Sequence, residues 1–145
     1  MTTPAPTDPV ESTVLRSAAS KPAGFQYIVL RCVPRVDREE FLNVGVVVYS
    51  QSADYLCSAS RIRTAAIQAL APELDLDAVA AALDAVQRLC CGDEAAGAAG
   101  RTALRQRFGW LAAPKSTVVQ PGPVHGGMTA DPAGQLEHLL RALVG

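Results

Sequence analysis

The residues best suited to bind or react fall into two groups, and the first lies early in the chain. Arg31 and Glu40 flank a connection of hairpin length between two apolar segments. If those segments pair in register as strands, the guanidinium and the carboxylate can form a bidentate ion pair at one end of the sheet. Such a pair acts either as a structural clamp or as part of a site for an anion or ligand.

Asn43 is the one polar side chain inside the apolar run 41–49, two residues before Gly45. A buried carboxamide needs hydrogen-bond partners, most simply backbone groups next to Gly45. This favours a β-bulge fixed by Asn43 and Gly45. Because bulges often re-aim side chains beside binding sites, a functional role for Asn43 stays open.

The second group is a cluster of polar side chains in the C-terminal part, formed by Lys115, Ser116, Thr117, Gln120 and His125. A lysine before two hydroxyls resembles a phosphate contact, but the glycine-rich loop of a P-loop does not precede it. His125 is either a mobile general base or a turn histidine, and the lack of a paired Ser or Cys nucleophile favours the turn.

Composition narrows the function classes further. The net charge is −1 and aromatic residues make up 5%, which disfavours a nucleic-acid partner. No apolar run reaches the length of a membrane span, and the N-terminus lacks the pattern of a secretory signal. The four cysteines form no C-x-x-C pair, so we expect reduced thiols, no metal, no cofactor and a cytoplasmic location. The arginines that follow the glycine-rich connection favour a solvated face over a phosphate-binding patch; they are Arg101, Arg105 and Arg107.

The chain divides into a loose tail over residues 1–24, rich in Thr, Pro, Ser and Ala, and a single domain over 25–145. Period-two alternation and valine-rich runs predict an antiparallel three-stranded meander. Its central strand is nearly all apolar, which is typical of a strand buried on both faces. The predicted strands span 26–33, 41–49 and 55–62.

Helices and one late strand complete the predicted fold. Apolar residues at alternating spacings of three and four indicate a helix over 76–91, capped by Asp75 or Asp77 and ended by Gly92. We expect an α+β two-layer domain in which three to four helices pack on the meander plus the late strand, which pairs beside an outer strand of the meander. The remaining predicted elements are helices over 64–70, 104–111 and 132–144, a flexible connection over 92–100 and a strand over 116–120.

Two motifs resemble those of a known family. The first is Tyr27-x-x-x-Arg31-x-x-Pro34 followed by Glu40-Phe41-Leu42-Asn43-Val44-Gly45-Val46, and the second runs from Phe108 through Pro114-Lys115-Ser116-Thr117 and Gln120 to His125-x-Gly127 and Asp131-Pro132. Over residues 25–145 the chain resembles the bacterial family called domain of unknown function 3037. The resemblance implies no established activity. It does imply a context, since relatives are often encoded beside a kinase-like protein of the HipA type.

These observations favour a non-catalytic interaction or regulatory protein, with a HipA-like kinase or a second copy of the chain as partner. The sequence shows no nucleophile–base pair, no metal-ligand spacing and no nucleotide-binding loop. Enzyme activity is therefore left open but disfavoured. In addition, the strand over 41–49 needs cover on both faces, which can leave apolar surface for another chain. The alternative is a small enzyme or a nucleotide- or anion-binding module near Arg31, Glu40, Asn43 and Lys115.

Overall fold

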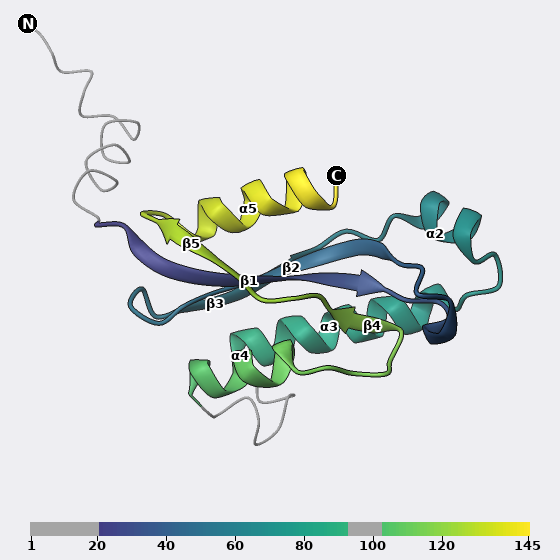
Figure 1. Ribbon diagram of the computed structural model, residues 1–145, viewed down its shortest axis with the longest axis horizontal. Coiled ribbons are helices and arrows are strands. Elements are labelled where there is room, and N and C mark those ends of the chain that lie inside the picture. The colour runs from purple at the N-terminus through teal and green to yellow at the C-terminus, as the bar shows by residue number, and fades with distance from the viewer. Residues whose placement is uncertain (1–20, 93–102) are drawn as a thin grey trace, which may run out of the picture.

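Three strands form the predicted meander. β1 spans Ala23–Cys32, β2 spans Leu42–Ser50 and β3 spans Tyr55–Ser60. They pair antiparallel in the order β3-β2-β1 in the computed structural model, which describes residues 21–92 and 103–145 (Figure 1). The alternating and valine-rich patterns therefore identified all three strands.

Two short strands pair with the other edge of β1. β4 spans Val119–Pro121 and pairs with the end of β1, whereas β5 spans His125–Thr129 and pairs with its beginning. The late strand lies beside an outer strand of the meander, as expected, but it begins at Val119 and not at residue 116. β5 occupies a segment for which the sequence predicted only a turn.

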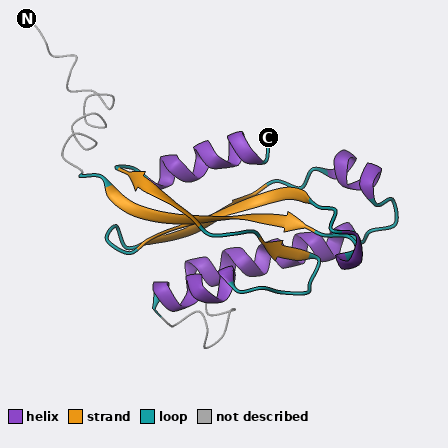
Figure 2. Ribbon diagram, in the orientation of Figure 1, coloured by secondary structure: helices purple, strands orange, loops and turns teal. Residues whose placement is uncertain are grey.

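The helices pack on both faces of this sheet (Figure 2). α5 lies on one face, over β2 and β3, and α3 and α4 lie on the other face (Figure 1). The fold is therefore an α+β domain with an antiparallel sheet, as the sequence predicts, with helices on both faces of the sheet. The helical segments are a 3-10 helix, η2, over Val36–Arg38, and the α-helices α2 over Thr64–Leu70, α3 over Leu76–Cys91, α4 over Leu104–Ala112 and α5 over Pro132–Leu143.

The ends of the two longest helices follow the capping residues in the sequence. The Asp75 carboxylate accepts hydrogen bonds from the backbone N–H groups of Asp77 and Ala78, at 3.0 and 3.3 Å. α3 ends at Gly92, whose φ of 71° lies in the left-handed region that glycine adopts without a steric penalty. At α5, the Asp131 carboxylate accepts from the N–H of Gly134, and Pro132 occupies the first turn.

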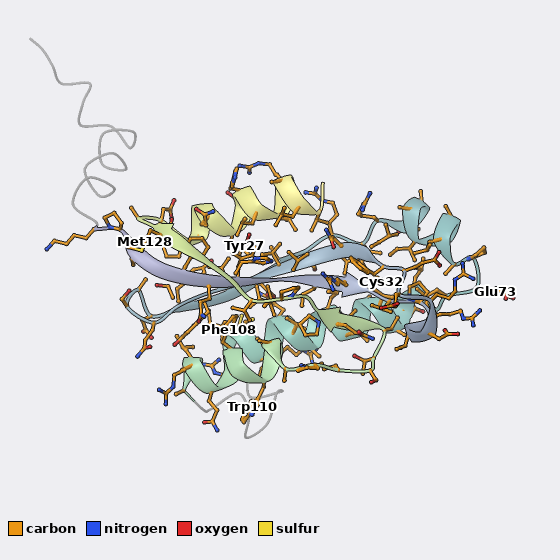
Figure 3. All side chains as sticks on the ribbon, viewed as in Figure 1. Tyr27, Cys32, Glu73, Phe108, Trp110 and Met128 are labelled. Atoms are coloured by element: carbon orange, nitrogen blue, oxygen red, sulfur yellow. The ribbon has the colours of Figure 1, made fainter. Side chains whose placement is uncertain are left out.

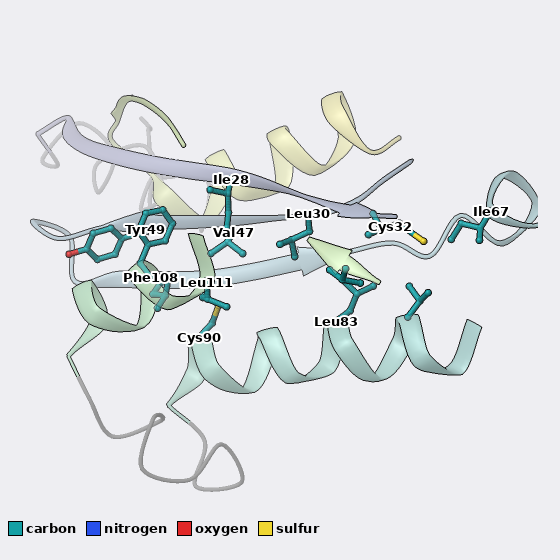
Figure 4. Close-up of a cluster of buried hydrophobic side chains, with 14 residues drawn as sticks. Ile28, Leu30, Cys32, Val47, Tyr49, Ile67, Leu83, Cys90, Phe108 and Leu111 are labelled. Carbon is teal, nitrogen blue, oxygen red and sulfur yellow. The ribbon is translucent and has the colours of Figure 1, made fainter. Parts of the chain in front are cut away.

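β2 is buried on both faces, as its composition predicts. Val44, Val46, Val47 and Val48 have no exposed surface. Val46 and Val48 pack in the cluster under α5, whereas Val44 and Val47 pack in the larger cluster on the side of α3 and α4 (Figure 4). In the larger cluster the rings of Tyr49 and Phe108 stack with centroids 5.0 Å apart, which joins β2 to α4.

A β-bulge interrupts the pairing of β1 with β2. Leu30 pairs with Gly45 and Arg31 pairs with Asn43, so Val44 is the extra residue on β2. A Cβ on residue 45 would lie 3.0 Å from the carbonyl oxygen of Ala59 on β3, so the neighbouring backbone approaches Gly45 closely. The bulge that the sequence predicts at Gly45 is therefore confirmed.

Two predicted segments fall largely outside the described residues. Of the loose tail predicted over 1–24, only the last few residues are described, and Ala23 and Gly24 already belong to β1. The flexible connection predicted over 92–100 is described at Gly92 alone. Within the described ranges, no helix combines the length and the apolar character needed to cross a membrane.

Candidate functional site

Two residues of the early polar group and one of the late group lie in one row across the sheet. Arg31 on β1 lies opposite Asn43 on β2 and opposite Gln120 on β4. Residues directly opposite each other in an antiparallel ladder project to the same face. Because Phe25 and Tyr27, at alternate positions of β1, pack in the cluster under α5, this row projects to the face that carries α5.

The guanidinium of Arg31 lies over an aromatic ring. Its guanidinium carbon is 4.1 Å from the centroid of Phe41, a cation–π contact, and 42% of Phe41 remains exposed. Gly122, just beyond β4, lies close to the Arg31 guanidinium. A Cβ on residue 122 would lie 3.1 Å from both Cζ and Nε of Arg31. Glycine at residue 122 therefore leaves room for the guanidinium.

The charge of Arg31 has no counterpart in the described part of the chain. The Nε atom is shielded from solvent and has no hydrogen-bond partner there. The two terminal nitrogens also make no hydrogen bond or ion pair with described residues, but they remain accessible to solvent. Because an unpaired polar atom away from water costs free energy, this half-buried guanidinium is suited to receive an anionic group from outside.

The prediction that Arg31 and Glu40 form an ion pair is wrong. Glu40 accepts two hydrogen bonds from Arg38 instead, at 2.7 and 3.2 Å, and this contact lowers the pKa of Glu40. The reason is the tight connection between the strands, in which η2 is followed by Glu39 with a φ of 55°. This turn brings Arg38 and Glu40 together on the exposed tip of the hairpin and leaves Arg31 without a carboxylate.

Asn43 also has a different partner from the one predicted. Its Nδ2 donates to the carbonyl oxygen of Leu143, at 3.1 Å, and not to backbone groups beside Gly45. Leu143 is the last residue of α5, so Asn43 fixes the C-terminal end of that helix against the sheet next to Arg31. This role arises because the half-buried carboxamide satisfies a carbonyl at the helix C-terminus, where the last carbonyl groups lack partners within the helix.

Lys115 closes α4 and takes no part in the row around Arg31. Its Nζ donates to the carbonyl oxygens of Trp110, Ala113 and Leu111, at 2.5, 3.1 and 3.5 Å. A cation at a helix C-terminus interacts favourably with the helix dipole, whereas partial burial lowers the pKa of Lys115. The suggested phosphate contact is therefore replaced by a helix cap.

The replacement Lys115→Ala is expected to lower the free energy of unfolding by about 1 kcal/mol, because it leaves these carbonyl oxygens without their donor. Chemical denaturation followed by circular dichroism measures the change. The control is Ser116→Ala, at the neighbouring exposed residue, which should change stability by less than about 0.5 kcal/mol. Equal midpoints for the two variants would contradict the capping role.

The remaining predicted residues stabilise local structure. The Thr117 hydroxyl donates to the carbonyl of Val119, and Gln120 Nε2 donates to the carbonyl of Thr117, which together form the turn into β4. Ser116 is exposed in the same turn. His125 lies in β5 and not in a turn, and its ring stacks on Tyr27 with centroids 5.0 Å apart. Among the residues of the late polar group, only Gln120 lies opposite Arg31 in the sheet.

Residues 27–144 match the model of a family described as a protein of unknown function, DUF3037, and the match covers most of the chain. The chain belongs to the DUF3037 family. The row of Asn43, Arg31 and Gln120 lies within the matched DUF3037 region. No match is found among curated proteins or among solved structures.

Two site features of this DUF3037 chain escaped the sequence analysis. Phe41 was grouped with the buried strand over 41–49, but it precedes β2 and covers Arg31. Gly122 lies just beyond the predicted late strand over 116–120, and its contact with Arg31 depends on β4 pairing with β1. A large aromatic residue directly after a charged hairpin tip was the available signal for Phe41.

One of the α4 arginines differs from the expected solvated face. Arg107 is buried, with 8% of its surface exposed, and its Nη1 donates to the carbonyl oxygens of Leu89 and Cys90 at the end of α3. Arg105 is exposed, and Arg101 lies outside the described residues. Arg107 therefore joins two helices and is not available to a phosphate backbone.

Cysteines and metal-ligating residues form no joint site in the described part of this DUF3037 chain. Within residues 21–92 and 103–145, no group of three or more His, Cys, Asp or Glu side chains is placed to hold a metal ion. All four cysteines are free thiols. Burial raises the pKa of Cys90 to about 12, so this thiol stays protonated at neutral pH and is a poor nucleophile.

Proposed function

We propose that this protein is a non-catalytic interaction protein of the cytoplasm and that Arg31 and Phe41 form the centre of its contact surface. The observation that carries the proposal is the half-buried guanidinium of Arg31, which lies over an exposed phenyl ring and has no partner of opposite charge among the described residues. Arginine and aromatic side chains supply much of the binding energy at protein interfaces. The free state of all four thiols supports a reducing compartment.

The expected partner presents a carboxylate to Arg31. A guanidinium whose edge is accessible matches a carboxylate with two parallel hydrogen bonds. Two acidic residues of the neighbouring hairpin turn are engaged with other arginines, since Asp37 bonds to Arg35 and Glu40 bonds to Arg38. The kinase-like protein implied by the family resemblance is the first partner to test, followed by a second copy of the chain.

The replacement Arg31→Met separates a binding role from a structural role. Methionine keeps an apolar contact with Phe41 but removes the charge and the unpaired Nε. The free energy of unfolding should therefore stay within about 1 kcal/mol of the wild type, or rise, because a buried donor without a partner is removed. Binding of a partner through its carboxylate should fall at least about tenfold, since a charge-assisted pair contributes about 1.5–3 kcal/mol.

The measurement is quantitative mass spectrometry of proteins co-purified from the native host with tagged wild type, Arg31→Met and Arg105→Met. Arg105 is the matched control because it is an exposed arginine on α4, across the sheet from Arg31. A specific partner should be depleted by Arg31→Met alone and then bind the purified protein directly in calorimetry. Equal recovery of every partner with all three proteins would reject the proposed surface.

The second candidate function is a small anion- or nucleotide-binding module at the same residue. It is favoured by one observation, the solvent access of the terminal nitrogens of Arg31. Titration with acetate, inorganic phosphate and ATP, followed by NMR of the arginine side chains, separates the two candidates. Saturable binding of one of these small anions, lost in Arg31→Met, would support this second function.

A further inference from the structure

β5 forms an edge of the sheet. It pairs with β1 on one side, and among the described residues no strand pairs with its other side (Figure 1). The strand is exposed over its length except at Thr129, which is half-buried. The edge therefore presents backbone hydrogen-bonding groups to whatever approaches it.

The pairing of β1 determines which residues of β5 face outward. The Val29 carbonyl of β1 accepts from the N–H of Gly122, and the N–H of Val33 donates to Val118, so alternate residues of β1 direct their backbone groups toward β4 and β5. In that series Tyr27 pairs with His125 and Phe25 pairs with Gly127. The intervening residues of β5, Gly126 and Met128, consequently direct their N–H and C=O groups away from β1.

This edge lacks the protection that most edge strands have. Edge strands are commonly blunted by charged side chains, proline or bulges. The sequence contains no charged residue from 116 to 130, and the prolines lie at residues 121 and 123, before β5 begins. Val124, directly before β5, and Met128, within it, are exposed apolar residues, at 45% and 66% of their surface.

We propose that β5 pairs antiparallel with β5 of a second copy of this chain, about a two-fold axis through Gly127. In this register Gly126 of each copy lies opposite Met128 of the other, and the outward backbone groups form roughly four hydrogen bonds. Each exposed Met128 side chain then lies over a glycine, where a side chain is missing and room is available. A two-fold interface must be complementary to itself, and this uncharged edge meets its copy without repulsion.

The proposed interface goes beyond the partner surface at Arg31 and is spatially distinct from it. Met128 lies beside the beginning of β1, opposite Gly24, whereas Arg31 precedes Cys32 at the far end of β1. Figure 3 shows Met128 and Cys32 at opposite ends of the sheet. A dimer formed through β5 therefore leaves the Arg31 surface of both copies accessible, and each site can be tested without the other.

Sedimentation equilibrium of the full chain tests the proposal, with Met128→Lys as the disrupting variant. At about 100 µM, where micromolar affinity gives mostly dimer, the wild type should approach twice the chain mass of 15.2 kDa. Met128→Lys should remain near 15.2 kDa, because it places a charge at the centre of the paired edge. The control Val36→Lys replaces another exposed apolar residue, on η2, and should behave as the wild type.

Amide hydrogen exchange tests the register. The amides of Gly126 and Met128 should exchange at least about tenfold more slowly in the wild type than in Met128→Lys, whereas that of Gly127, bonded to β1, should differ little. If Met128→Lys fails to fold, Val124→Lys replaces it, since Val124 is exposed and directly precedes β5. A monomeric wild type, a dimer that survives these substitutions, or a dimer with rapidly exchanging Gly126 and Met128 amides would each overturn the proposal.

Discussion

Replacing Gly45 by valine is expected to lower the free energy of unfolding by about 3 kcal/mol or more. A Cβ at this position would lie 3.0 Å from the Ala59 carbonyl oxygen and 3.2 Å from side-chain atoms of Leu30 and Ser60. The first of these neighbours is backbone of β3, which cannot move without disturbing its pairing with β2. The two additional methyl groups of valine then increase the overlap inside a fully buried part of the sheet.

Urea denaturation followed by circular dichroism measures this loss, with Gly109→Val as the matched control. Gly109 lies on α4, and a Cβ there meets no atom within 4 Å. Its replacement should change stability by less than about 0.5 kcal/mol, because glycine and valine both have low helix propensity. If Gly45→Val unfolds at the same urea concentration as Gly109→Val, the close approach of β3 to Gly45 is incorrect.

Replacing Arg107 by methionine is expected to lower the free energy of unfolding by about 3 kcal/mol. This effect is as large as the one expected for Gly45→Val. The substitution keeps much of the apolar side chain but removes the donors that reach the Leu89 and Cys90 carbonyl oxygens, at 2.8 and 3.0 Å. Hydrogen bonds from charged groups contribute about 1.5–3 kcal/mol each, and buried carbonyl groups left without donors carry a further penalty. The loss should appear as weaker packing of α4 on α3.

The control for Arg107→Met is Arg105→Met, two residues away on the same helix. Arg105 is exposed, so its replacement should change stability by less than about 0.5 kcal/mol. Hydrogen exchange should additionally show faster opening of α4 in Arg107→Met than in the control. Equal stability of the two variants would mean that Arg107 contributes no more than a solvated arginine does.

The regular elements of the fold were predictable because their patterns are strong. The meander follows from alternation in β1 and from the valine run of β2, which can be buried only in the middle of a sheet. Asp75 marks the start of α3 because its carboxylate accepts from free backbone N–H groups, and Gly92 marks the end because glycine adopts the left-handed conformation without a steric penalty. β5 was missed because His125–Thr129 includes two glycines and no alternating apolar pattern. It is a strand only because β1 offers a partner at that position.

The candidate site was predictable in its members more than in its contacts. Arg31 and Asn43 were selected as polar residues in an apolar context, and pairing of the late strand with β1 brings Gln120 beside Arg31. The partners could not be predicted, because they depend on geometry that spacing does not show. A left-handed residue in the hairpin turns Glu40 toward Arg38, and Asn43 bonds to Leu143, a hundred residues away.

The contact between Asn43 and Leu143 has a consequence for synthesis on the ribosome. The five strands of the described sheet have been made once Thr129 emerges, but among the described residues the helix that covers the face of β2 formed by Val46 and Val48 is α5, which follows them. Until α5 is released, this apolar face of the sheet in a nascent chain therefore lacks the helix that covers it. During that interval the chain is a substrate for chaperones that hold apolar surface, and ribosomes that stall before residue 132 would leave an aggregation-prone product.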